Sequence, residues 1–138
     1  MKVLADSCVW SLLLRRRRGT VMSGDEQLVL ASLVEAIKDG RVGIIGSIRQ
    51  EVLSGIKDLA QFEELRFALE AFPDEPLTTL HYEEAARLYN LCRSRGVECG
   101  STDILICAVA VRMKWTILTC DGGLKRCIGV LRAEGLTL

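Results

Sequence analysis

The sequence predicts one α/β domain built on a parallel sheet that helices flank. Three observations predict it: the chain has 138 residues, short apolar runs of strand type alternate with segments of helical periodicity, and acidic residues follow the apolar runs. A chain of this length fits one compact domain, so we expect a single domain over residues 1–138. Alternating strands and helices are typical of parallel sheets, in which binding sites form beyond the carboxyl ends of the strands.

Hydrophobic periodicity and breaker residues place the elements along the chain. Short apolar or β-branched runs predict strands over residues 2–5, 42–45, 77–80 and 115–119. Apolar residues at helical spacing predict helices over residues 8–14, 27–37, 46–53, 61–71, 82–95 and 104–111, the last with Ser101 or Thr102 as its N-cap. A final helix and strand within residues 124–138 are expected to complete the fold.

The overall charge excludes a bulk positive field. Lysines and arginines number 18, as do aspartates and glutamates, so any site for a polyanion must be local. The basic run from Arg15 through Arg16 and Arg17 to Arg18 is a candidate for contact with RNA or a protein partner. Four adjacent arginines are more often a solvated segment, and the sequence leaves both interpretations open.

Cysteine usage and hydropathy indicate a protein of the cytoplasm. We expect no signal peptide, and several of the six cysteines sit in apolar runs, so we expect reduced thiols that are mostly small core residues. No Cys-x-x-Cys pair and no Cys/His grouping appears, which argues against structural zinc. No apolar stretch is long enough for a membrane span. The cysteines are Cys8, Cys92, Cys99, Cys107, Cys120 and Cys127.

Four acidic residues are predicted to gather at one edge of the sheet. Singly, an aspartate at a helix start is often only a cap, and a helical glutamate is often solvated. Jointly, each follows an apolar strand or opens a helix at the same end, and clustered carboxylates need a cation to offset their repulsion. Oxygen donors favour Mg²⁺ or Mn²⁺. The candidate metal ligands are Asp6, Glu51, Asp103 and Asp121.

Four segments also resemble the motifs of PIN domains, in order and spacing. They are residues 3–10, 48–53, 101–110 and 117–121. The chain is most similar to toxin ribonucleases of the VapC type, and the resemblance covers almost its whole length. It implies a parallel sheet of about five strands, cleavage of RNA phosphodiester bonds with a divalent metal, and a homodimer held by a small antitoxin.

The resemblance assigns roles to individual residues. Asp6, Glu51, Asp103 and Asp121 become ligands of the metal or of its waters, and Ser7 and Thr119 are weaker candidates for supporting them. Two departures bear on the number of metal ions. Cys8 replaces a frequent serine, and residues 120–123 lack the asparagine and extra acid often found around the final aspartate. Apolar residues in 10–14 and 62–69 are expected mostly in the core, with a share available for a dimer face or an antitoxin groove.

Other functions are open on the residues alone. The first alternative is a module of the same fold with a weak catalytic site, which binds RNA or protein without cleaving. A phospho-acceptor receiver domain also gathers acids at strand ends, but it normally has an adjacent acidic pair and a late lysine, which this chain lacks. Other metal phosphoesterases usually use histidine ligands, and His81, the single histidine, lies outside every acidic motif.

Overall fold

The fold is a small parallel sheet with helices on both faces. The computed structural model describes residues 1–15, 19 and 21–138, and among these its sheet has three strands in the order β2-β1-β3. The strands are β1 (Val3–Ala5), β2 (Val42–Gly43) and β3 (Thr116–Leu118). The helices are α1 (Ser7–Leu14), α2 (Gly24–Lys38), α3 (Gly46–Leu53), α4 (Leu59–Leu69), α5 (Thr79–Ser94), α6 (Ser101–Met113) and α7 (Gly122–Ala133).

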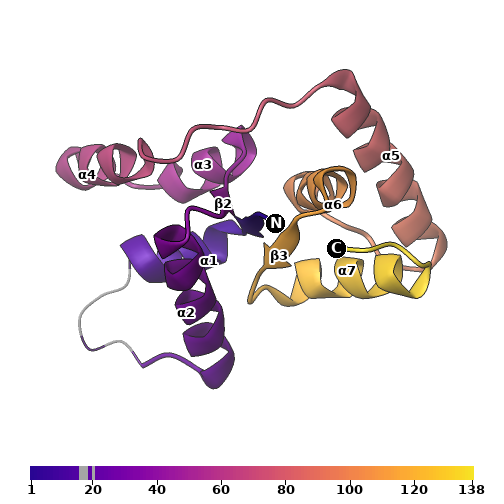
Figure 1. The fold of residues 1–138 in the computed structure, drawn as a ribbon, viewed down its shortest axis with the longest axis horizontal. Coiled ribbons are helices and arrows are strands. Elements are labelled where there is room, and N and C mark those ends of the chain that lie inside the picture. The colour runs from indigo at the N-terminus through magenta and orange to yellow at the C-terminus, as the bar shows by residue number, and fades with distance from the viewer. Residues whose placement is uncertain (16–18, 20) are drawn as a thin grey trace.

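The sheet separates two groups of helices. Figure 1 shows α1 to α4 on one side of the strands and α5 to α7 on the other. Helix α2 contacts all three strands, whereas α6 contacts β3 and packs against both α5 and α7. All residues of β1 are buried, and Leu4 at its centre has no exposed surface. The central strand therefore has a continuous apolar sequence, as expected for a strand covered on both faces.

The register of the sheet brings the carboxyl ends of its strands to one edge. Both neighbours of β1 are parallel to it, and Leu4 pairs with Gly43 on one side and with Ile117 on the other. A Cβ atom at Gly43 would overlap the indole ring of Trp115. Only glycine therefore allows β2 to lie this close to the residue that precedes β3.

The α/β class is confirmed, whereas the expected number of strands is wrong. The predicted strand at 77–80 is absent, because Thr78 is the N-cap of α5 and its backbone N–H donates to Nδ1 of His81 at 3.0 Å. The final predicted strand is also absent. Residues 134–138 form no strand, and the carbonyl of Leu138 instead accepts two hydrogen bonds from the Arg132 guanidinium. His81 is thus a buried capping residue.

Several predicted bounds shift for local reasons. The strand at 42–45 ends at Gly43, and Ile44 makes only a single bridge, to Asp74. Helix α2 begins at Gly24 because Ser23 and Glu26 form a capping box. The N-cap of α6 is Gly100, so neither Ser101 nor Thr102 has that role.

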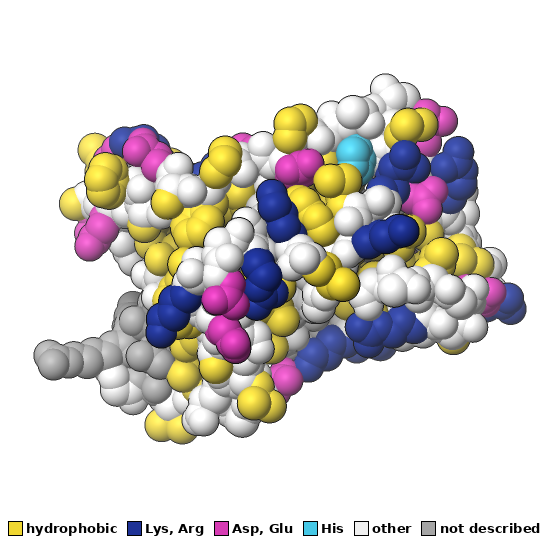
Figure 2. Space-filling model, in the orientation of Figure 1, with side chains coloured by type: hydrophobic (Ala, Val, Ile, Leu, Met, Phe, Trp, Pro, Cys, Tyr) yellow, Lys and Arg dark blue, Asp and Glu magenta, His cyan; other side chains and the backbone are white. Residues whose placement is uncertain are grey.

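The apolar residues of α1 and α4 are divided between the core and the surface, so the expectation that most of them lie in the core is not confirmed. Trp10 is fully buried and packs edge-on against Phe72, with ring centroids 5.0 Å apart. Leu65 and Leu69 are also buried, whereas Leu13 and Phe67 are exposed. None of the described helices is long and apolar enough to cross a membrane. Figure 2 shows acidic and basic side chains interspersed on the face it draws, in keeping with the balanced charge of the chain.

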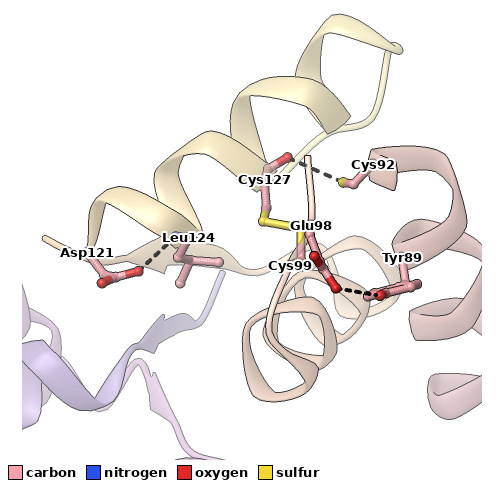
Figure 3. The surroundings of a disulfide bond; sticks show 7 residues. All are labelled: Tyr89, Cys92, Glu98, Cys99, Asp121, Leu124 and Cys127. Atoms are coloured by element: carbon pink, nitrogen blue, oxygen red, sulfur yellow. Dashed lines mark hydrogen bonds between the residues drawn. A yellow bond between two sulfur atoms is a disulfide. The ribbon is translucent and has the colours of Figure 1, made fainter. Parts of the chain in front are cut away.

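One disulfide corrects the expectation that all six cysteines are reduced. Cys99, in the segment before α6, is bonded to Cys127 of α7, with a Cα–Cα distance of 6.3 Å (Figure 3). The other four cysteines are free thiols. The pairing was not visible in the sequence, because the two residues are 28 positions apart and both sit among apolar residues.

Removing this disulfide should destabilise the fold. Closing a loop of 28 residues restricts the unfolded chain, so the Cys99→Ser/Cys127→Ser variant should lose about 3 kcal/mol of unfolding free energy. Urea unfolding without reductant measures the loss. With reductant present, variant and wild type should unfold at nearly the same urea concentration; a difference that persists there would show that packing, and not the cross-link, is responsible.

Candidate metal centre

The four candidate acids all lie at the carboxyl edge of the sheet. Asp6 directly follows β1 and is the N-cap of α1, and Asp121 follows β3 and is the N-cap of α7. Asp103 lies in the first turn of α6, and Glu51 lies in α3, the helix that follows β2. Because these helices return antiparallel to the strands, their amino-terminal ends meet at this edge.

Asp6 is the buried member of the group, and its two carboxylate oxygens accept hydrogen bonds. Oδ1 accepts from the backbone N–H of Ser7 at 2.7 Å and from its hydroxyl at 3.5 Å. Oδ2 accepts from Thr119 Oγ1 at 3.1 Å and from Cys8 Sγ at 3.4 Å. Hydrogen bonds of this kind stabilise an ionised carboxylate away from water and fix its orientation.

Cys8 takes part in this arrangement as a protonated thiol. Burial raises the pKa of Cys8 to about 12, so its Sγ keeps the proton that it donates to Asp6. The same sulfur accepts the backbone N–H of Cys120 at 3.4 Å. The cysteine that departs from the usual serine therefore still supplies a donor to Asp6.

Thr119 links Asp6 to Asp121. Its buried hydroxyl donates to Asp6 Oδ2 and accepts the backbone N–H of Asp121 at 3.0 Å. The carboxylate of Asp121 in turn accepts the backbone N–H of Leu124 at 2.8 Å, at the start of α7 (Figure 3). One threonine thus sets the position of the loop that carries the last acid relative to the first.

Thr119→Val tests this link. Valine keeps the shape of threonine but leaves Asp6 with one donor fewer and the Asp121 N–H without an acceptor, so unfolding free energy should fall by about 2 kcal/mol. Denaturant titration measures the change. Thr116→Val is the matched control, since the exposed Thr116 hydroxyl donates only to the sulfur of Met1. Equal stability of the two variants would contradict the linking role.

The electrostatics of Asp103 and Glu51 show that both respond to their acidic neighbours. Burial raises the pKa of Asp103 to about 6, and the negative charges of Asp6, Asp121 and Glu51 add to this effect. Partial removal from water also raises the pKa of Glu51, as do Asp6 and Asp121, while the Ser7 side chain lowers it. This crowding of like charge destabilises the fold unless a cation offsets it.

The raised pKa of Asp103 predicts the pH dependence of an Asp103→Asn variant without metal. Above pH 6 the Asp103 carboxylate of the wild type is ionised in both the folded and the unfolded state. The folded state then bears the full free-energy cost of burying this charge near other carboxylates, so the variant should be more stable. As pH falls from about 6 towards 3.8, the folded wild type takes up a proton that the unfolded chain does not, and the difference should vanish.

Chemical denaturation in EDTA between pH 4 and 8 measures this trend. Asp39→Asn is the control, because Asp39 is an exposed residue at the opposite, amino-terminal edge of the sheet, where it pairs with Arg41. An Asp103→Asn variant that is less stable than wild type at pH 8 would contradict the electrostatic crowding.

The donors present suit a hard divalent cation. Among the described residues, no three His, Cys, Asp or Glu side chains stand close enough together to form a ready-made metal-binding group. Mg²⁺ requires fewer protein ligands than this, because it keeps several waters and takes one or two carboxylates directly. Since every acid of the group supplies carboxylate oxygens and His81 lies outside it, the residues fit Mg²⁺ or Mn²⁺ bound largely through waters.

The remaining sequence candidates differ in where they lie. Ser7 and Thr119 contact Asp6, whereas Arg15 is the exposed C-cap of α1. Arg16, Arg17 and Arg18 lie outside the described residues. Sequence reasoning missed the part played by Cys8, although its place in the first motif, where serine is frequent, was the available signal.

Comparisons with known proteins place this fold and site in a family. The family model described as PIN domain matches residues 3–128, so the chain belongs to the PIN-domain family. Members of this family are generally nucleases and typically use divalent metal ions. No curated protein matches the chain significantly.

A solved structure shares the fold. The crystal structure of FitAcB from Neisseria gonorrhoeae is similar over 91% of this chain and 93% of that chain, with a TM-score of 0.68 and 20% sequence identity. At this identity the likeness supports the architecture described above.

Proposed function

We propose that the chain is a Mg²⁺- or Mn²⁺-dependent endoribonuclease that hydrolyses RNA phosphodiester bonds. The observation that carries the proposal is the group of four carboxylates at the carboxyl edge of a PIN fold, where burial and the neighbouring negative charges raise the pKa values of Asp103 and Glu51. Groups with perturbed pKa values concentrate at functional sites, and charge crowding of this kind is what a bound cation would relieve.

The four acids have different roles in the proposed hydrolysis. A divalent ion, when bound, supplies a Lewis acid that activates water and offsets charge on the leaving oxygen. Asp6 and Asp103 hold the principal ion. Asp6 is fixed by the donors of Ser7, Cys8 and Thr119, so it has little freedom to turn away. Glu51 and Asp121 orient the attacking water, or hold a second ion, on the more exposed side of the group.

The partners follow from the same proposal. RNA is the substrate, and by the resemblance to VapC-type toxins the chain is the toxin of a type II toxin–antitoxin pair, a homodimer bound by a small antitoxin. The exposed Leu13 and Phe67 are available for such protein contacts. Arg15 to Arg18 are candidates for contact with RNA or antitoxin. A cytoplasmic location stays a proposal, and the Cys99–Cys127 disulfide is a reason to test it, because disulfides are uncommon in that compartment.

One observation favours a second function, a PIN-like module that binds RNA or protein with weak catalysis or none. The described acids do not form a ready-made metal-binding group. A module of this kind would bind its partner equally well with and without metal, whereas the nuclease requires metal for turnover.

Cleavage of a panel of structured and single-stranded RNAs tests the nuclease. Wild type should cut with Mn²⁺ or Mg²⁺ and not with EDTA, and Asp103→Asn and Asp6→Asn should lose at least about a hundredfold in rate, because each removes a ligand of the principal ion. Asp39→Asn, at the opposite edge, should cut like wild type. Metal-independent binding without cutting, and no heat of Mn²⁺ binding by calorimetry, would support the binding module instead.

A further inference from the structure

Arg126 of α7 lies beside the acid group without a partner of its own. It is exposed, and among the described residues it makes no hydrogen bond and no ion pair. Nearby cations are already engaged: Lys125 pairs with Asp25 at 2.7 Å, and Arg132 binds the carbonyl of Leu138. Arg126 is therefore the cation of α7 that can take an external anion.

Helical spacing turns its guanidinium towards the site. Residues 122, 123 and 126 share one face of α7, and a helical side chain leans towards the amino-terminal end. A Cβ atom at Gly122 would lie 3.6 Å from Arg126 Nη1. The arginine thus lies over the two glycines that follow Asp121.

Gly123 lies between the arginine and the acid. A Cβ atom at this position would lie 3.9 Å from Arg126 Nη2 and only 3.1 Å from Asp121 Oδ2, so a side chain here would crowd the carboxylate, and both groups border the same position. No ion pair joins them. The Asp121 carboxylate instead accepts the Leu124 N–H, so the helix terminus is already capped and the guanidinium is the donor that remains.

We propose that Arg126, beside Gly123 and Asp121, forms a subsite for an RNA phosphate at the metal centre. The inference rests on the proposed function and deepens it. The carboxylates alone repel a phosphate, so the substrate needs two cations: the metal ion on the acids and the guanidinium beside Asp121. A planar guanidinium can bind two oxygens of one phosphate, which fixes its orientation as well as its position.

Arg126→Gln and Arg126→Lys test the subsite on a fluorescein-labelled single-stranded RNA with Mn²⁺. The glutamine variant should lower kcat/KM between about tenfold and a hundredfold, since a charged hydrogen bond to substrate is lost. The dependence of log KM on log salt should also flatten by about 0.7, the contribution of one phosphate contact in a single strand. The lysine variant should keep the salt dependence but lose the bidentate geometry, so its kcat/KM should lie between those of the wild type and Arg126→Gln.

A control variant and a metal-binding measurement separate this role from a structural one. Arg112→Gln, at the far end of α6 from Asp103, is the matched loss of an exposed arginine and should behave as wild type. Mn²⁺ affinity, by calorimetry, should be unchanged or slightly tighter in Arg126→Gln.

The outcomes distinguish a failure of the phosphate subsite from a failure of the proposed nuclease function. Wild-type cleavage with an unchanged kcat/KM and salt dependence in Arg126→Gln would overturn the subsite alone. Weaker Mn²⁺ binding by Arg126→Gln would also overturn it, since the arginine would then act on the acids and not on RNA. A wild type that neither binds nor cuts the RNA with Mn²⁺ would overturn both proposals.

Discussion

The repulsion among four carboxylates is the constraint on which the rest of this structure depends. Parallel strands and returning helices bring Asp6, Glu51, Asp103 and Asp121 to one edge, and burial there raises the pKa of Asp103 to about 6. Such an arrangement costs folding free energy, and no basic side chain of the described residues pairs with any of the four. The fold therefore keeps an unpaired negative charge at this edge of the sheet, which is where we propose that a cation binds.

The surroundings of Asp6 show how the fold tolerates this cost. Donors from α1 and from the end of β3 converge on a carboxylate that is almost fully buried, and Thr119 connects it to the loop of Asp121. The disulfide restrains two more of the helices that carry the acids. It joins α7, which Asp121 caps, to the segment that leads into α6 and Asp103 (Figure 3). The hydrogen bonds around Asp6 and the disulfide thus both restrain the helices that carry the acids.

The sequence predicted those features that depend on periodicity and chain order. The α/β class and the places of Asp6, Asp103 and Asp121 at strand ends or helix starts followed from apolar runs and their spacing, whereas the PIN family followed from the resemblance of four motifs. Features that depend on local capping were not predictable in this way. The segment Leu77–Leu80 has the composition of a strand, but the cap formed by Thr78 and His81 starts a helix within it. At the end of the sequence, the carbonyl of Leu138 accepts a hydrogen bond from Arg132 and does not pair with a strand. The Cys99–Cys127 contact depends on packing between α6 and α7, which no local pattern encodes.

The departures from the usual PIN motifs gain a physical interpretation at this edge. Cys8 retains its proton because of burial and therefore donates to Asp6 as a serine hydroxyl would, so the substitution preserves the hydrogen bond while changing the atom that makes it. The glycines of residues 120–123 add no negative charge beside Asp121, and a side chain at Gly123 would crowd the Asp121 carboxylate and approach the Arg126 guanidinium. Under the proposed function the two differences act on separate steps, since Cys8 would support a ligand of the ion, whereas Gly123 would leave Asp121 and Arg126 uncrowded.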